Sequence, residues 1–227
     1  MVLDLMRDAV RLLRSVPRRL RSRQAIFTRI YSTNGWGSEE SVSGCGSTLR
    51  ETRIVRQILP ALIARYGLRS LLDIPCGDCH WISSIDFGAP SYIGADIVGE
   101  IVHKNRAIFG APAGGRTFMH LDLVRDQLPF AELVLCRDCM IHLSNADVLS
   151  ALRNVRRSGA KYLLATTYTA RSSNPDIVTG DWRPINLQAA PFSLGEPLEL
   201  ISEEWDWAGG YHADKCIGLW DARALPA

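Results

Sequence analysis

The sequence predicts an α/β fold in which one mostly parallel β-sheet carries helices on both faces. Short apolar runs alternate with helical stretches over residues 48–168, and this alternation is typical of a parallel sheet wrapped by helices. The last two apolar runs follow one another without a helix, which predicts an antiparallel hairpin at one edge of the sheet. A chain of 227 residues can bury one full core and is short for two domains. We therefore expect a single domain over residues 31–227, preceded by an arm.

The arm, residues 1–30, is basic. It contains Arg7, Arg11, Arg14, Arg18, Arg19, Arg21, Arg23 and Arg29, so with a net charge of +2 the rest of the chain is acidic. Apolar residues recur at near-helical spacing over residues 3–16, which predicts a short amphipathic helix that Pro17 interrupts. A solvated arm is the favoured interpretation, and contact with an anionic membrane surface or a nucleic acid is the alternative.

Composition excludes several classes of protein. A hydrophobic fraction of 47% with 22% charged residues is ordinary for soluble globular proteins and excludes a disordered or fibrous chain. No run of about 18 apolar residues predicts a membrane span, and the N-terminus lacks the apolar core of a secretion signal. We expect a cytoplasmic protein, peripheral to the membrane if the arm binds there. The arginine-rich start also resembles a mitochondrial transit peptide, but Asp4 and Asp8 argue against one.

The first elements of the domain are a loop and a helix. Residues 31–47 are rich in Gly and Ser and predict a loop, which at this length is commonly functional. A lid over a bound ligand could be formed by Trp36, Glu39, Ser41, Ser43 and Gly46. A surface loop with its Trp anchored in the core is the alternative. A helix is then expected from a cap at Ser47 or Thr48 to about Tyr66, before Gly67.

Seven strands are expected after this helix. Their apolar runs occupy residues 70–74, 91–97, 116–123, 131–136, 161–168, 198–204 and 215–222. Between the fifth and sixth runs, residues 171–197 are polar and without a clear period, which predicts an irregular segment. Ligands of such sheets bind beyond the carboxyl ends of the strands, at the switch point of the topology.

Candidate binding residues follow the first three strands. The first strand leads into Asp73, Pro75, Cys76, Gly77 and Asp78, with Trp81 soon after, and Gly77 would let a ligand approach the backbone. The second strand ends in Asp96 and Ile97. A carboxylate there, a little under 20 residues after the turn, is placed to accept hydrogen bonds from a ribose diol. At the end of the third, Asp122 beside Leu123 could hold an adenine amino group.

With these motifs the sequence resembles the class I S-adenosylmethionine-dependent methyltransferases over about residues 48–222. The resemblance implies a Rossmann-like fold, S-adenosylmethionine as cofactor and methyl transfer. It also implies that residues 73–78 hold the methionine part of the cofactor, that Asp96 binds the ribose and that Asp122 lies by the adenine. The segments Trp-Gly-Ser, Asp-Ile-Pro-Cys-Gly-Asp, Arg-Asp-Cys and Trp-Arg-Pro-Ile-Asn-Leu look like a bacterial subgroup of this family.

The turn after the first strand departs from that family's pattern. Pro75 replaces the usual first glycine and removes one N–H donor, and Cys79 stands where a later glycine often occurs. A nicotinamide or flavin dinucleotide is disfavoured, because only Gly77 of the required glycines is present. Asp78 would repel a pyrophosphate but attract a sulfonium or ammonium group. We expect Asp78 to replace the lost donation.

The fourth strand leads into Arg137, Asp138 and His142. In the family this position faces the methyl group and the acceptor, so Asp138 and His142 are the candidate bases or orienters, and Arg137 is a candidate cofactor contact. In the alternative, Arg137 and Asp138 simply pair and His142 packs against the following helix. These two interpretations are equally favoured.

Two Cys-x-x-Cys pairs raise the question of zinc. They follow the first and fourth strands, at Cys76 with Cys79 and at Cys136 with Cys139, which are neighbours in this fold. A zinc ion there would occupy the cofactor's own pocket. We expect no metal, with Cys76 and Cys136 as small buried residues.

The acceptor side is predicted from residues 171–197. Trp182, Arg183 and Asn186 combine a ring, a guanidinium and an amide, which suits a polar acceptor such as a sugar. Structural packing over the sheet is the alternative, and for His212, Asp214 and Lys215 a solvated turn is favoured. We therefore predict methylation of a hydroxyl on a glycan or other small molecule. Methylation of a protein or nucleic acid, and binding of an adenosyl ligand without catalysis, are the alternatives, with nucleic acid the less expected partner.

Overall fold

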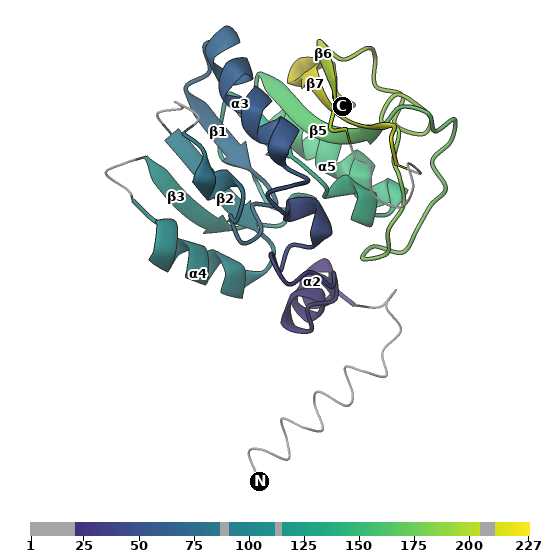
Figure 1. Cartoon of the computed structure of the whole chain (residues 1–227). Coiled ribbons are helices and arrows are strands. Elements are labelled where there is room, and N and C mark those ends of the chain that lie inside the picture. Colours follow the sequence, from purple (N-terminus) through teal and green to yellow (C-terminus); the bar gives the residue numbers. More distant parts are fainter. Residues whose placement is uncertain (1–20, 87–90, 112–114, 205–211) are drawn as a thin grey trace.

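The computed structural model describes residues 21–86, 91–111, 115–204 and 212–227 (Figure 1). The amphipathic helix expected over residues 3–16 lies outside the described residues. Within them, no helix is long and apolar enough to cross a membrane.

A seven-stranded sheet forms the centre of the domain and confirms the predicted fold class. Its strands are β1 (Ser70–Asp73), β2 (Ser91–Asp96), β3 (Arg116–His120), β4 (Leu133–Cys136), β5 (Tyr162–Tyr168), β6 (Glu199–Ser202) and β7 (Lys215–Asp221). Their order is β3-β2-β1-β4-β5-β7-β6. The first five strands are parallel, and β7 runs antiparallel to both β5 and β6, so the C-terminal hairpin lies at one edge.

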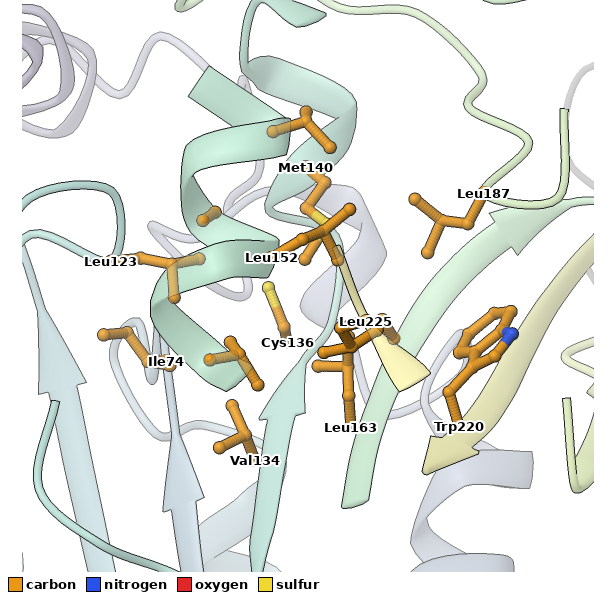
Figure 2. Packing of buried hydrophobic residues seen from close by; sticks show 14 of the residues in the cluster. Ile74, Leu123, Val134, Cys136, Met140, Leu152, Leu163, Leu187, Trp220 and Leu225 are labelled. Carbon is orange, nitrogen blue, oxygen red and sulfur yellow. The ribbon is translucent and has the colours of Figure 1, made fainter. Parts of the chain in front are cut away.

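Helices cover both faces of this sheet. They are α2 (Arg23–Ser32), α3 (Arg53–Arg65), α4 (Gly99–Phe109) and α5 (Asn145–Arg157), with 3-10 turns at Cys45–Ser47, Ile82–Ser84, Met140–His142 and Ala222–Ala224. Side chains alternate across each strand, so Leu71 enters the core under α3 and Leu72 enters the core under α5. Figure 2 shows the second core, in which Leu152 of α5 belongs to the same cluster as Val134, Leu163 and Trp220 of the sheet.

The strands are slightly shorter than the apolar runs that predicted them, and two boundaries before β1 also differ from the sequence prediction. The helix expected from residue 48 begins at Arg53, because residues 49–52 form turns and Thr52 takes the N-cap position. Helix α2 runs to Ser32, across the boundary expected between the arm and the domain. Ile26 and Ile30 of α2 are buried, so the described end of the arm packs on the domain.

The topology places a switch point between β1 and β4. From β1 the chain proceeds outward through β2 to β3, and it then returns to β4 on the other side of β1. Connections leave these two strands in opposite directions, which opens a crevice beyond their carboxyl ends. Residues that follow β1, β2 and β4 therefore meet at one place.

Candidate functional site

A cavity, here called the inner cavity, lies at that switch point. Residues following β1 line it with Asp73, Pro75, Cys76, Gly77, Asp78 and Trp81, and residues following β2 add Asp96, Ile97, Val98 and Ile101. Residues following β4 complete the sheet side with Arg137, Asp138, Cys139 and His142. Trp36, Val42, Ser43 and Ser47 of the loop and Phe27 and Tyr31 of α2 close it. The structure thus brings together the candidates from strands one, two and four.

The turn after β1 is held against the end of β2. Cys76 N–H donates to Ala95 O (2.8 Å), and Gly77 N–H donates to Asp96 Oδ2 (3.1 Å). Gly77 has a φ of 52°, a conformation that favours glycine, and a Cβ there would overlap the Ser43 hydroxyl. The single glycine of this turn therefore meets a requirement of the fold.

Asp96, the predicted ribose acceptor, ends β2 and lines the inner cavity. Its Oδ1 accepts from Val98 N–H (2.8 Å) while Oδ2 accepts from Gly77 N–H, and its side chain is buried. Burial raises its pKa to about 6, although the backbone hydrogen bonds act in the opposite direction. Each carboxylate oxygen has two acceptor positions, so Asp96 can receive two further hydroxyl hydrogens.

Asp73, at the end of β1, is a second buried carboxylate of the inner cavity. Tyr92 Oη donates to its Oδ2 (2.8 Å). Burial raises its pKa to about 7, outweighing that hydrogen bond, and the nearby charge of Asp96 adds to the rise. A cation in the inner cavity would favour the ionised form of both carboxylates.

Asp78 holds the loop over the inner cavity. Its carboxylate accepts from Ser41 Oγ (2.9 Å), Val42 N–H (3.0 Å) and Ser43 Oγ (3.2 Å). In return, Asp78 N–H donates to Ser43 Oγ (3.0 Å). The expected replacement of a cofactor donor by Asp78 is therefore not what its contacts support. Of the expected lid residues, Trp36 and Ser43 line the inner cavity.

Helix α2 supplies a wall that the sequence did not predict. Phe27 and Tyr31 line the inner cavity from this helix, and Arg23 anchors it to the domain. The Arg23 guanidinium donates to Asp122 Oδ2 (2.8 Å from Nη2, 3.0 Å from Nε) and to Asp147 Oδ1 (2.8 Å). The sequence did contain a signal for this wall, because Phe27 and Tyr31 are four residues apart and therefore lie on the same face of a helix.

Asp122 and Leu123 lie outside the inner cavity, contrary to their expected place beside an adenine. Strand β3 ends at His120, and the Asp122 carboxylate is bound by Arg23 and by Val124 N–H (2.9 Å). Leu123 is buried in the core under α5. The third acidic strand end therefore fastens α2 to the sheet.

A buried cluster of four charges follows β4. It consists of Arg137, Asp138, Glu203 and Lys215, and we call it the charge cluster. Arg137 donates to both oxygens of Glu203 (2.9 Å each), and Lys215 Nζ lies 2.7 Å from Asp138 Oδ2 and 3.0 Å from Glu203 Oε2. Arg137 Nη1 also donates to Gly46 O (2.8 Å), which ties the loop to this cluster.

Asp138 is a poor proton acceptor in this setting. Burial alone would raise its pKa, but the charges of Arg137 and Lys215 outweigh burial and hold the pKa at about 2. Its backbone is also fixed, with a φ of 51° and an N–H donated to Thr166 Oγ1 (2.9 Å). The expectation that Asp138 takes the acceptor proton is corrected, because its pKa is far from neutral.

His142, the other predicted base, is held in one orientation by a hydrogen bond. Its Nδ1 lies 2.9 Å from Asp181 O, and a carbonyl oxygen only accepts, so Nδ1 carries the hydrogen. In the neutral ring Nε2 then holds the lone pair. The Trp36 indole stacks on the imidazole with ring centroids 4.1 Å apart. His142 lines the inner cavity and a second cavity beside it.

That second cavity, here called the outer cavity, shares Trp36, Ser43, Ser47, Asp138 and His142 with the first. Tyr168, Trp182, His212 and Lys215 line the rest of it together with residues 44–46 and Ile141. Trp182, a predicted acceptor residue, thus lines the outer cavity. Residues 212–214 form a partly exposed turn, as predicted, but a solvated position is wrong for Lys215, which begins β7, is 1% exposed and belongs to the charge cluster.

Arg183 and Asn186 do not line the outer cavity. The buried Arg183 guanidinium donates to Met140 O (3.2 Å) and Asn145 Oδ1 (2.8 Å). Asn186 donates to Arg171 O (2.8 Å) and accepts Gln188 N–H (2.9 Å). Arg183 thus ties the irregular segment to the connection between β4 and α5, and Asn186 satisfies backbone groups within the segment, so their expected substrate role is corrected to a structural one.

The four cysteines of the two Cys-x-x-Cys pairs occupy different cores. Cys76 and Cys79 pack under α3, whereas Cys136 and Cys139 pack under α5. All are free thiols, and hydrogen bonding to Cys79 together with burial raises the pKa of Cys76. Among the residues that the structure describes, no group of three or more His, Cys, Asp or Glu side chains could hold a metal ion.

No protein-family model matches the sequence, and no curated protein matches it. Solved structures do resemble it. N-methyltransferase NodS from Bradyrhizobium japonicum WM9, in complex with S-adenosyl-L-homocysteine, is 10% identical, with a TM-score of 0.61 over 87% of this chain and 98% of that chain. Magnesium protoporphyrin IX methyltransferase from Synechocystis PCC 6803, with bound S-adenosylmethionine, is 15% identical, with a TM-score of 0.60 over 88% and 97%.

Human N-acetylserotonin methyltransferase, in complex with S-adenosylmethionine, is 13% identical, with a TM-score of 0.60 over 86% of this chain. The match spans 58% of the human chain, a little more than half of its length. These likenesses show that the chain has the fold of the class I S-adenosylmethionine-dependent methyltransferases.

Proposed function

We propose that the chain is an S-adenosylmethionine-dependent methyltransferase whose acceptor is a hydroxyl group of a small molecule or glycan. One observation carries this proposal. Asp73, Gly77 and Asp96 meet in the inner cavity, and the inner cavity shares His142 with the outer one. A donor site and an acceptor site are thereby joined at a candidate base.

The residues of the inner cavity fit the cofactor. Asp96 has free acceptor positions for the two ribose hydroxyls, and Asp73 offers a carboxylate to the positive charge of the methionine part. Ile97, Val98 and Ile101 give apolar surface beside Asp96 on which an adenine can pack. Phe27 and Tyr31 of α2 add aromatic surface to the same cavity.

The bound cofactor supplies a sulfonium methyl group, which the acceptor oxygen attacks as the S–CH₃ bond breaks and leaves its electron pair on sulfur. The chain's own residues position the acceptor and remove its proton. His142 Nε2, with Nδ1 held by Asp181 O, accepts the hydroxyl proton. Holding acceptor and donor in line provides most of the acceleration.

The structural neighbours support the cofactor and leave the acceptor open. Their structures hold S-adenosylmethionine or S-adenosyl-L-homocysteine, which supports an adenosyl ligand for this fold. Their names give different acceptors, including a magnesium porphyrin and N-acetylserotonin. The acceptor of this chain must therefore be argued from its outer cavity.

Calorimetric titration with S-adenosylmethionine and S-adenosylhomocysteine tests the cofactor. We expect both adenosyl ligands to bind the wild type with micromolar affinity and NAD not to bind. Asp96→Asn should lower the affinity at least about tenfold, because one lost hydrogen bond to a charged group contributes about 1.5–3 kcal/mol. Glu132→Gln is the matched control, because that carboxylate lies just before β4 at the opposite edge of the sheet. A folded wild-type protein that binds neither adenosyl ligand would refute the proposal.

A further inference from the structure

The outer cavity is walled by aromatic rings. Trp182 meets His212 at 5.0 Å between ring centroids and Tyr168 at 6.5 Å, with interplanar angles of 70° and 89°. Tyr168 and His212 are themselves 5.9 Å apart at 77°. Trp36 lines the same cavity and stacks on His142. Rings set at right angles present both faces and edges, which are the surfaces that a flat aromatic partner contacts.

The charges at the outer cavity are already paired. Asp138 and Lys215 line it, but their charged groups lie 2.7 Å apart, and Lys215 also contacts Glu203. Arg137 lies 3.2 Å from Asp138 and 2.9 Å from Glu203, so the two cations and two anions of the charge cluster balance one another. A charged acceptor would compete with these pairs, whereas an uncharged acceptor leaves them intact.

The two polar side chains that the sequence offered for a sugar point elsewhere. A sugar ring needs hydrogen-bonding partners for several hydroxyls, and Arg183 and Asn186 were the candidates in the sequence. Both are buried and donate to backbone carbonyls or to Asn145. Apart from the paired Asp138 and Lys215, the outer cavity is lined by five ring side chains, by Ile141 and by residues 43–47 of the loop, in which Ser43 and Ser47 carry hydroxyls.

A single imidazole base also favours a ring hydroxyl. Phenolic hydroxyls such as that of Tyr ionise near a pKa of about 10, whereas the pKa of water, to which aliphatic alcohols are closer, is about 15.7. Deprotonation of a phenol by an imidazole is therefore less unfavourable than deprotonation of an aliphatic alcohol. Asp138, with a pKa of about 2, adds nothing as a base.

From these observations we propose that the acceptor is a flat, uncharged aromatic molecule that is methylated on a ring hydroxyl. The inference rests on the proposed function and narrows its acceptor. The acceptor ring lies against Trp182 and its hydroxyl faces His142 Nε2. The phenolic oxygen takes the methyl group, its proton passes to His142, and the cofactor's sulfur retains the electron pair of the broken bond.

Binding to the whole chain saturated with S-adenosylhomocysteine tests this without turnover. The probes are naphthol, its saturated counterpart decahydronaphthol, and methyl glucoside, compared by calorimetry. We expect naphthol to bind several-fold, up to about tenfold, more tightly than decahydronaphthol, because aromatic pairing adds to area burial. Trp182→Ala should remove this preference and Trp182→Phe should keep it. Phe130→Ala, which changes a 60% exposed ring outside both cavities, should leave it unchanged.

The outcomes separate the two proposals. Equal or tighter binding of decahydronaphthol overturns the aromatic acceptor, as does binding of none of the probes. Preference for methyl glucoside overturns it in favour of a sugar. Each of these results leaves the cofactor site intact if S-adenosylhomocysteine binds. Failure of S-adenosylhomocysteine itself to bind refutes the proposed function, and the aromatic acceptor falls with it.

Discussion

The indole of Trp36 lies against the imidazole of His142, with ring centroids 4.1 Å apart and planes inclined by 36°. These residues are far apart in the chain, and both line the inner and outer cavities. The stacked pair therefore stands where the two cavities adjoin. With Nδ1 held by Asp181 O, the imidazole is fixed on one side by a hydrogen bond and on another by a ring.

His142 should be needed for turnover and not for cofactor binding. We expect His142→Gln to lower kcat by about 10²- to 10⁴-fold, the usual contribution of a general base, with the dissociation constant of S-adenosylmethionine changed less than about threefold. Trp36→Phe, which keeps a ring against position 142, should retain most of kcat. Steady-state kinetics and calorimetry on the same preparations check both values. An unchanged kcat in His142→Gln would show that another group takes the proton.

Asp78 should act through the loop that it holds. Asp78→Ala removes the acceptor of three loop donors at residues 41–43. We expect the KM for S-adenosylmethionine to rise roughly tenfold to a hundredfold, since hydrogen bonds to charged groups contribute about 1.5–3 kcal/mol, and the loop to become sensitive to proteolysis. Asp221→Ala, which removes an exposed pair with Arg223 and the cap of the turn at Ala222–Ala224, far from both cavities, is the control. Equal protease resistance in the two variants would argue against this role.

Asp73 should make stability depend on pH. Its pKa is about 7 in the folded protein and 3.8 as an ordinary value, so between these pH values the folded state holds a proton that the unfolded chain has lost. The contribution of Asp73 to the free energy of unfolding therefore falls as pH rises from about 4 to about 7. Asp73→Asn, which stays uncharged, should flatten this part of the pH profile in denaturant titrations, whereas Asp86→Asn at the exposed surface should not.

Cofactor affinity should change in the opposite sense. A cationic ligand favours ionised Asp73 and Asp96, whose pKa values are about 7 and about 6, so binding of S-adenosylmethionine should tighten as pH rises through 6 and 7. Calorimetry at several pH values should also detect proton release on binding. Affinity that weakens over this range would contradict an ionised carboxylate pair around the ligand.

Lys215 should stabilise the folded state through the charge cluster. Lys215→Met leaves Asp138 and Glu203 with one buried cation instead of two, and breaking a buried pair in this way costs about 3–5 kcal/mol. Lys161→Met is the matched control, because its pair with Glu132 is exposed and should contribute less than about 1 kcal/mol. Denaturant titration of both variants measures the loss in the free energy of unfolding. Equal losses would show that the charge cluster stabilises the fold no more than an exposed ion pair does.

The fold could be predicted because short apolar runs alternate with helical stretches along the chain. Each apolar run became a strand, and the absence of a helix before the last run predicted the hairpin of β6 and β7. Asp73, Gly77 and Asp96 could be placed for the same reason, since a residue that follows a parallel strand lies at the carboxyl edge whatever its distant partners.

The mistaken residues are those whose role depends on a distant partner. Asp122 is bound by Arg23, which lies 99 residues earlier, and Lys215 pairs with Asp138 across 77 residues. Arg183 reaches Met140 O, 43 residues earlier, and Asn186 reaches Arg171 O, 15 residues earlier. Local pattern predicts where the backbone runs, but it does not say which long polar side chain reaches which oxygen.

Because α2 forms part of the site, the site begins much earlier in the chain than the sheet does. The strands begin at Ser70, yet Phe27, Tyr31 and Trp36 contribute to the inner cavity from the region before α3. A fragment cut just ahead of α3 would keep every strand and lose one wall of that cavity. Engineers who graft this domain, or shorten it for crystallisation, should therefore place the cut upstream of Arg23, whose bonds to Asp122 and Asp147 fasten that wall in place.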